Sequence, residues 1–140
     1  MIWGRYNVLT IFAVESQKLI KVLIIEDEVS LLDVLQKKLE KEGYQVFAAC
    51  DGEEGLRQME AVKPDVVLLD IVMPRINGME VLQKMQQSES MSQIPVLIIS
   101  NSGEPIEIDR ALKLGAKDYI IKTEFDPQEV LEKMAKILAK

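Results

Sequence analysis

Four apolar residues at 66–69, Val-Val-Leu-Leu, run without alternation and end on a carboxylate, Asp70. Such a run of β-branched residues and leucine is typical of a strand that is buried on both faces, as in a parallel sheet. A short loop with Pro74 follows, and Gly78 begins an amphipathic segment. Because ligands of open α/β sheets bind outside the carboxyl ends of the strands, Asp70 lies where chemistry usually occurs.

Similar apolar runs recur along the chain and alternate with segments of helical periodicity. The expected strands cover 22–25, 44–49, 66–69, 95–100 and 119–121, with amphipathic helices between and after them and a loop at 88–93. Five βα units of this kind predict an α/β fold in three layers, a five-stranded parallel sheet with helices on both faces and right-handed crossovers.

The chain has 140 residues, which is enough for one domain with a core and too few for two ordinary ones. The regular pattern begins at Lys21, so we expect the domain at 21–140 and an N-terminal extension of unknown role at 1–20. The apolar stretch at 8–14 is far shorter than the roughly 20 residues that span a bilayer, and no small-residue cleavage site follows it. Neither a membrane segment nor a separate output domain is expected.

Composition excludes several classes of function. A net charge of −6 argues against a nucleic-acid surface, so no direct DNA binding is expected. The absence of histidine excludes Ser-His-Asp and Cys-His nucleophiles and zinc sites of ordinary composition, so a metal would need oxygen ligands, as magnesium and calcium do. Cys50 is the only cysteine, which rules out an internal disulfide and fits the reducing cytoplasm.

Polar side chains follow four of the five expected strands. They are Glu26 and Asp27 with Glu28 just beyond, then Asp70, Ser100 and Lys122. Since the carboxyl ends of parallel strands share one edge, we expect these groups to converge there. Clustered carboxylates repel one another unless a cation is present, and magnesium prefers oxygen ligands. A carboxylate can accept a phosphoryl group, with a metal and a lysine neutralising the transferred charge.

Each of these residues also has a purely structural explanation. Acidic side chains are favoured at helix N-termini, which accounts for one or two of the residues at 26–28. Asp70 could cap a turn, Lys122 could end a strand in solvent, and Ser100 could open a turn. The set as a whole, on four strand ends, favours the functional interpretation.

Four motifs resemble those of receiver domains in two-component response regulators, and the resemblance extends from residue 21 to residue 140. The motifs read VLIIEDE at 22–28, DGEEGL at 51–56, LDIVMPRING at 69–78 and GAKDYIIK at 115–122. The resemblance implies the flavodoxin-like strand order 2-1-3-4-5, for which a member of this family is a known example.

The resemblance also implies a role for each site residue. Asp70 would be the phosphoacceptor, and Lys122 would pair with the phosphoryl oxygens. Magnesium would be held by Glu26, Asp27 and Asp70, directly or through water, and by the backbone carbonyl of Val72.

Two further residues are implied in signalling. Ser100 would move to hydrogen-bond the phosphoryl group, and Tyr119 would swing inward as it moves. The change would reshape the face made by the helix at 104–114, the strand at 119–121 and the last helix. The implied function is a phosphorylation-activated switch without independent substrate turnover. Its partners would be a histidine kinase or histidine phosphotransfer protein and a downstream protein target, and homodimerisation on phosphorylation stays open.

The sequence departs from the family pattern at two positions. Thr123 stands where proline usually follows the lysine, which puts the position of Lys122 in question. Asn101 replaces a residue that is usually small. The alternative is therefore a pseudo-receiver, a protein-binding module that switches without phosphate, although the complete set of site residues argues against it.

Two other classes fit less well. A flavodoxin-like nucleotide or flavin binder would cradle phosphate in the loop after the first strand, where the acidic residues at 26–28 would repel it in the absence of a metal. An aspartyl-phosphate phosphatase usually has a second aspartate two residues after the nucleophile. Here that position is Val72, which has no proton to give.

Overall fold

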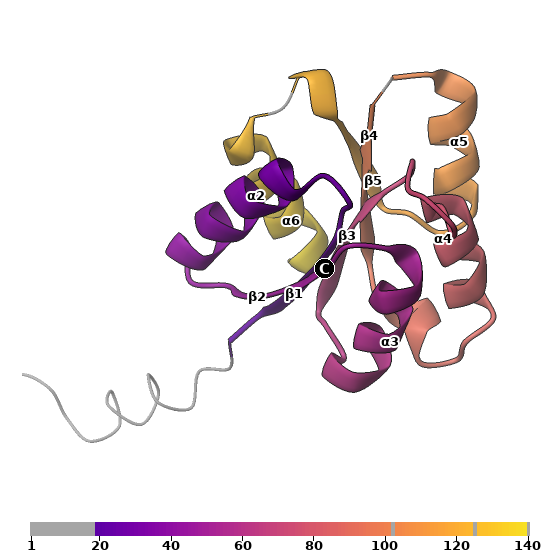
Figure 1. Cartoon of the computed structure of the whole chain (residues 1–140), viewed down its shortest axis with the longest axis horizontal. Coiled ribbons are helices and arrows are strands. Elements are labelled where there is room, and N and C mark those ends of the chain that lie inside the picture. Colours follow the sequence, from indigo (N-terminus) through magenta and orange to yellow (C-terminus); the bar gives the residue numbers. More distant parts are fainter. Residues whose placement is uncertain (1–18, 102, 125, 140) are drawn as a thin grey trace, which may run out of the picture.

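A single sheet of five parallel strands forms the middle layer of the protein (Figure 1). The computed structural model describes residues 19–101, 103–124 and 126–139. The strands are β1 (Lys21–Ile25), β2 (Gln45–Ala49), β3 (Val66–Asp70), β4 (Val96–Ser100) and β5 (Asp118–Ile121). Their order is β2-β1-β3-β4-β5 and every neighbouring pair is parallel, which confirms the predicted fold and the order 2-1-3-4-5.

Helices cover both faces of the sheet. One face carries α2 (Val29–Lys41) and α6 (Pro127–Leu138), and the other carries α3 (Gly52–Val62), α4 (Gly78–Gln86) and α5 (Pro105–Lys113) (Figure 1). Two short 3-10 helices are η2 (Met91–Gln93) and η3 (Lys122–Glu124). The stretch 88–93, predicted to be a loop, thus contains η2, in which the buried side chain of Met91 joins the core.

The central strand β3 is buried along its whole length, as its unbroken apolar run predicts. Val66 and Leu68 belong to the core cluster under α2 and α6, whereas Val67 and Leu69 belong to the cluster under α3, α4 and α5. Full burial of each such side chain stabilises the fold by about 1.5–3 kcal/mol. The strand is therefore a rigid support for the residue at its end.

Three of the five described α-helices begin with a side-chain cap, whereas α2 and α5 do not. Asp51, Asn77 and Asp126 each accept a backbone N–H from the first turn of α3, α4 and α6, respectively. Glu28 occupies the capping position of α2 but makes no such bond, and the first turn of α2 contains no acidic residue. Helix capping therefore does not explain the acidic residues at 26–28.

The described part of the chain contains no helix that is both long and apolar enough to cross a membrane. The N-terminal extension predicted at 1–20 lies outside the described residues, except for Leu19 and Ile20.

Candidate functional site

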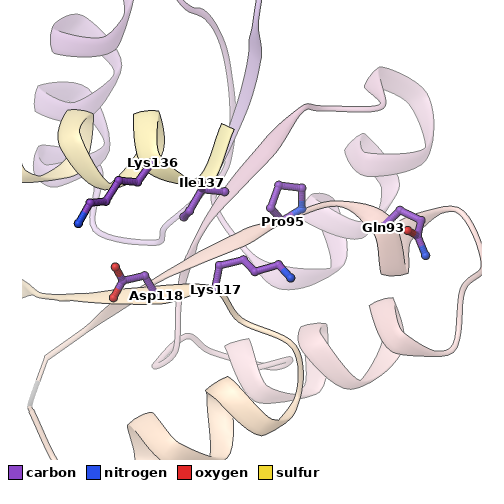
Figure 2. A pocket seen from close by; sticks show the side chains of 6 residues that line it. All are labelled: Gln93, Pro95, Lys117, Asp118, Lys136 and Ile137. Atoms are coloured by element: carbon purple, nitrogen blue, oxygen red, sulfur yellow. The ribbon is translucent and has the colours of Figure 1, made fainter. Parts of the chain in front are cut away.

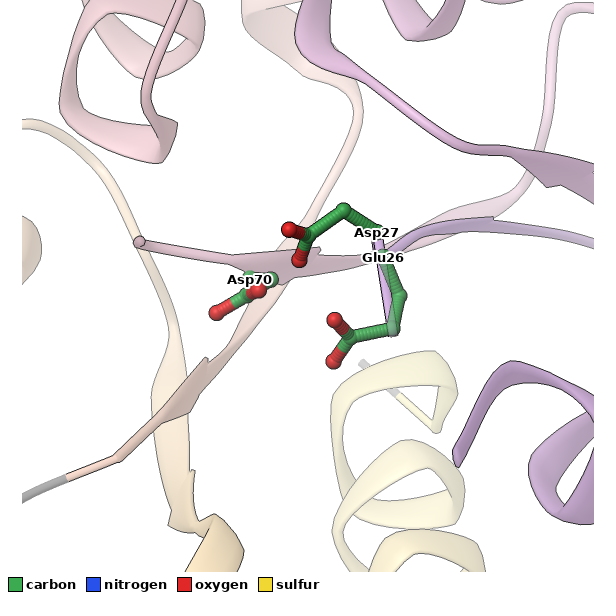
Figure 3. Close-up of side chains that lie close together, drawn as sticks. All are labelled: Glu26, Asp27 and Asp70. Carbon is green, nitrogen blue, oxygen red and sulfur yellow. The ribbon is translucent and has the colours of Figure 1, made fainter. Parts of the chain in front are cut away.

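The carboxyl edge of the sheet brings together the polar residues that end the strands. Glu26 and Asp27 directly follow β1, and Asp70 is the last residue of β3. Figure 3 shows the three carboxylates close to one another, and one oxygen atom of each lies within 4.8 Å of the others. Glu26 and Asp70 are fully buried, whereas Asp27 is exposed, so the cluster is open to solvent on the Asp27 side.

Lys122 places its ammonium between the two buried carboxylates. Its Nζ lies 2.8 Å from Glu26 Oε1 and donates a hydrogen bond to Asp70 Oδ2 at 3.1 Å. Glu28 Oε2 is farther away, at 3.6 Å. The Lys122 side chain is only 9% exposed. The pair of buried carboxylates thus shares one cation, and these three groups carry a net negative charge when both acids are ionised.

Backbone N–H groups orient the same carboxylates. Val72 donates to Asp70 Oδ1 at 3.3 Å, and Glu28 donates to Glu26 Oε2 at 3.0 Å. The loop after β3 passes close to Gly78, where an added Cβ would collide with the backbone carbonyl oxygen of Asp70. A glycine at the start of α4 therefore allows the helix to approach the site.

The electrostatics of the site are unfavourable to two negative charges. The pKa of Asp70 is raised from 3.8 to about 8, chiefly by burial and further by the neighbouring Glu26, while Lys122 lowers it in part. Burial by itself would lower the pKa of Lys122, but its bonds to Glu26 and Asp70 outweigh this effect and raise it. Extra positive charge beside Asp70 would favour its ionised form.

The donor set fits a hard divalent cation. Glu26, Asp27 and Asp70 offer carboxylate oxygens, the ligands that magnesium and calcium prefer. Glu26 Oε1 is buried and accepts no directed hydrogen bond from the described residues, although it lies near the Lys122 ammonium. These three residues could therefore hold a metal ion. Val72 lies in the adjoining loop, and the role of its carbonyl stays a prediction.

Ser100 and Tyr119 lie on the neighbouring strands and have partners on helices. Ser100 is fully buried at the end of β4, and its hydroxyl donates to Glu107 Oε1 of α5 at 3.1 Å. Tyr119 of β5 is half-buried, with Lys133 Nζ of α6 lying 5.0 Å from the ring centroid. Neither Glu107 nor Lys133 is singled out by the sequence, where each is an ordinary charged residue of an amphipathic helix.

The two residues that depart from the family pattern border the site. Thr123 and Asn101, with Lys122, Glu28 and Leu31, line a pocket of about 260 Å³. None of the described peptide bonds is cis. With threonine after it, Lys122 still reaches both buried carboxylates.

A larger pocket of about 580 Å³ lies at the opposite edge of the sheet, at the amino-terminal ends of β4 and β5 (Figure 2). It is lined by Gln93, Pro95, Lys117, Asp118, Lys136 and Ile137. It includes none of the residues of the carboxylate cluster, so the size of a cavity does not locate the candidate site.

The sequence matches the family model of the response regulator receiver domain over residues 22–135. Among curated proteins, it is 39% identical over 118 residues to the alkaline phosphatase synthesis transcriptional regulatory protein PhoP of Bacillus subtilis (strain 168). That alignment covers 84% of this chain and 48% of PhoP, so the chain spans about half the length of the curated relatives it matches.

Solved structures that match this chain are also response regulators. A CheY-like response regulator receiver domain protein of Methanospirillum hungatei matches with a TM-score of 0.80 at 30% identity, covering 87% of this chain and 95% of that one. The Vibrio cholerae chemotaxis protein CheY4 matches with a TM-score of 0.82 at 26% identity, covering 86% of this chain and all of that one.

Proposed function

The chain belongs to the response regulator receiver domain family, and from that premise we propose that it is a phosphorylation-activated switch of two-component signalling. The phosphoryl group would be accepted on Asp70. The observation that carries this proposal is the buried Asp70 carboxylate at a strand end, hydrogen-bonded to the Lys122 ammonium and within 4.8 Å of the carboxylate oxygens of Glu26 and Asp27.

The chemistry assigned to these residues is phosphoryl transfer to a carboxylate. An Asp70 oxygen attacks the phosphorus atom of a phosphohistidine, the P–N bond breaks, and the leaving imidazole takes up a proton. Lys122 turns its ammonium from the carboxylates toward the phosphoryl oxygens. Bound at Glu26, Asp27 and Asp70, magnesium would supply positive charge that favours ionised Asp70 and neutralises the incoming phosphoryl oxygens.

The expected partners follow from this reaction. A histidine kinase or a histidine phosphotransfer protein would supply the phosphoryl group, and a downstream protein would recognise the phosphorylated form. PhoP is named a transcriptional regulatory protein, but the chain matches only about half of it. The net charge of −6 over the whole chain argues against direct DNA binding, and we expect none. We also expect a cytoplasmic location, which the single cysteine fits. We expect no turnover of an independent substrate.

Intact-mass measurement tests the proposal. The full chain is incubated with acetyl phosphate, a small phosphodonor, in the presence and absence of magnesium. We expect a magnesium-dependent gain of one phosphoryl group in the wild type and none in Asp70→Asn. Asp33→Asn is the matched control, because Asp33 is an exposed carboxylate that pairs with Lys37 on α2.

The opposite outcomes distinguish the alternatives. No gain of mass in the wild type under any condition would contradict the proposal and favour a pseudo-receiver. A normal yield of phosphoprotein from Asp70→Asn would contradict the assignment of the phosphoacceptor. Sustained hydrolysis of a phosphomonoester would favour a phosphatase.

A further inference from the structure

We propose that Glu107 acts as a latch on Ser100: it holds the Ser100 hydroxyl in the unphosphorylated protein and thereby opposes phosphorylation of Asp70. This inference rests on the proposed function and adds a regulatory residue to it. Glu107 is a positioning residue, because it acts through Ser100 and not on the phosphoryl group itself.

The latch joins a strand end to a helix. Ser100 is the last residue of β4 and is fully buried, so the position of its Cα is fixed by the sheet. Glu107 lies in the first turn of α5 and is half-buried. The Ser100 Oγ donates to Glu107 Oε1 over 3.1 Å. The hydrogen bond therefore ties the functional edge of the sheet to α5, a helix of the face expected to signal.

A phosphoryl group on Asp70 would compete for the same proton. The Ser100 hydroxyl has one hydrogen, and both a carboxylate and a phosphoryl oxygen accept it in a charge-assisted bond. Donation to the phosphoryl group therefore requires that the bond to Glu107 breaks. Phosphorylation would in this way remove the side-chain tie between β4 and the first turn of α5, which turns a local change of charge into a change at a helix.

The surroundings of Glu107 offer its carboxylate another position. A pocket of about 520 Å³ between α5 and the loop after β3 is lined by Glu107, Val72 and Arg110, among others. Arg110 lies three residues after Glu107 on α5, at a spacing that brings helical side chains together. Once released, the Glu107 carboxylate can pair with Arg110 in this pocket.

Beryllofluoride binds to a carboxylate as a stand-in for the phosphoryl group. Its affinity reports how strongly the hydrogen bond between Ser100 and Glu107 opposes modification of Asp70. Binding to the full chain with magnesium is followed by ¹⁹F NMR. Glu107→Ala should bind beryllofluoride about fivefold more tightly than the wild type, because no hydrogen bond to Glu107 has to be broken first. Glu107→Gln, which keeps an acceptor but loses the charge, should show a smaller gain. Asp109→Ala removes a carboxylate from the same helix and should leave the affinity unchanged, because Asp109 is exposed and pairs with Lys113.

A double-mutant cycle separates the latch from simple charge repulsion. In a Ser100→Ala background, Glu107→Ala should produce no further gain, since no hydroxyl is left to release. A gain of the same size in that background would mean that Glu107 acts by repulsion, which would overturn the latch. Equal affinities of wild type and Glu107→Ala would overturn it as well while leaving the proposed function intact. Absence of binding by every variant would contradict the proposed function and the latch with it.

Discussion

Replacing the proposed phosphoacceptor should stabilise the metal-free protein. Asp70 is fully buried, and its carboxylate shares the Lys122 ammonium with Glu26. Burial and the Glu26 carboxylate raise the pKa of Asp70 from 3.8 to about 8 in the folded protein. Between these two values the folded protein holds a proton that the unfolded chain has lost. The free energy of unfolding therefore falls as the pH rises from about 4 to about 8.

The expected change in the free energy of unfolding follows from the size of the pKa shift of Asp70. One pKa unit corresponds to about 1.4 kcal/mol, so the raised pKa of Asp70 costs about 2 kcal/mol at pH 5 and about 5 kcal/mol at pH 8. Asparagine avoids this cost, and its Oδ1 can still accept from the Lys122 ammonium, but it lacks the negative charge, which forgoes at most about 1.5–3 kcal/mol of that charge-assisted bond. Asp70→Asn should therefore leave stability nearly unchanged at pH 5 and raise it by about 2–3 kcal/mol at pH 8.

Urea unfolding followed by circular dichroism in EDTA measures this difference at both pH values. Asp33→Asn should show no such pH-dependent gain, because the Asp33 carboxylate is exposed. Magnesium should stabilise the wild type more than Asp70→Asn, since the variant lacks one of the three clustered carboxylates. An Asp70→Asn variant that is no more stable than the wild type at pH 8, or that gains as much at pH 5, would contradict the raised pKa of Asp70.

Three further substitutions test the supports of the site. Lys122→Gln should lower stability at pH 8 by about 3 kcal/mol or more in urea unfolding, because Glu26 and Asp70 lose the cation between them; an unchanged midpoint would contradict the geometry. Gly78→Ala should lower both the melting temperature and the yield of phosphoprotein, because its Cβ would meet the Asp70 carbonyl oxygen; normal values for both would count against that close approach. Asn77→Ala should cost about 1 kcal/mol through loss of the cap of α4 and still be phosphorylated, and a loss of phosphorylation without a loss of stability would be the contrary result.

The fold could be predicted because its signals are local. The unbroken apolar run at 66–69 and the alternation of such runs with helical periodicity are readable in the sequence, and they predict a parallel sheet with buried strands. The convergence of Glu26, Asp70 and Lys122 follows from the same fact, since parallel strands end at one edge.

The contacts that could not be predicted join side chains of different elements. Glu107 meets Ser100 only because α5 packs beside the end of β4, and its sequence context is that of any acidic residue in a first helical turn. Arg75 is similar: its backbone has a φ of +66°, and its Nη2 lies 3.1 Å from Oδ2 of Asp51, which caps α3. Such pairings depend on distances in space that no local pattern of residues specifies.

The identity of the phosphorylated residue tests the central claim most directly. The full chain is treated with acetyl phosphate and magnesium, the acyl phosphate is reduced with borohydride, and the modified residue is located by peptide mass spectrometry. We predict modification at Asp70 alone, and none when magnesium is withheld. Modification of Glu26 or Asp27 in place of Asp70 would contradict the account, as would a wild-type protein that remains unmodified with magnesium present.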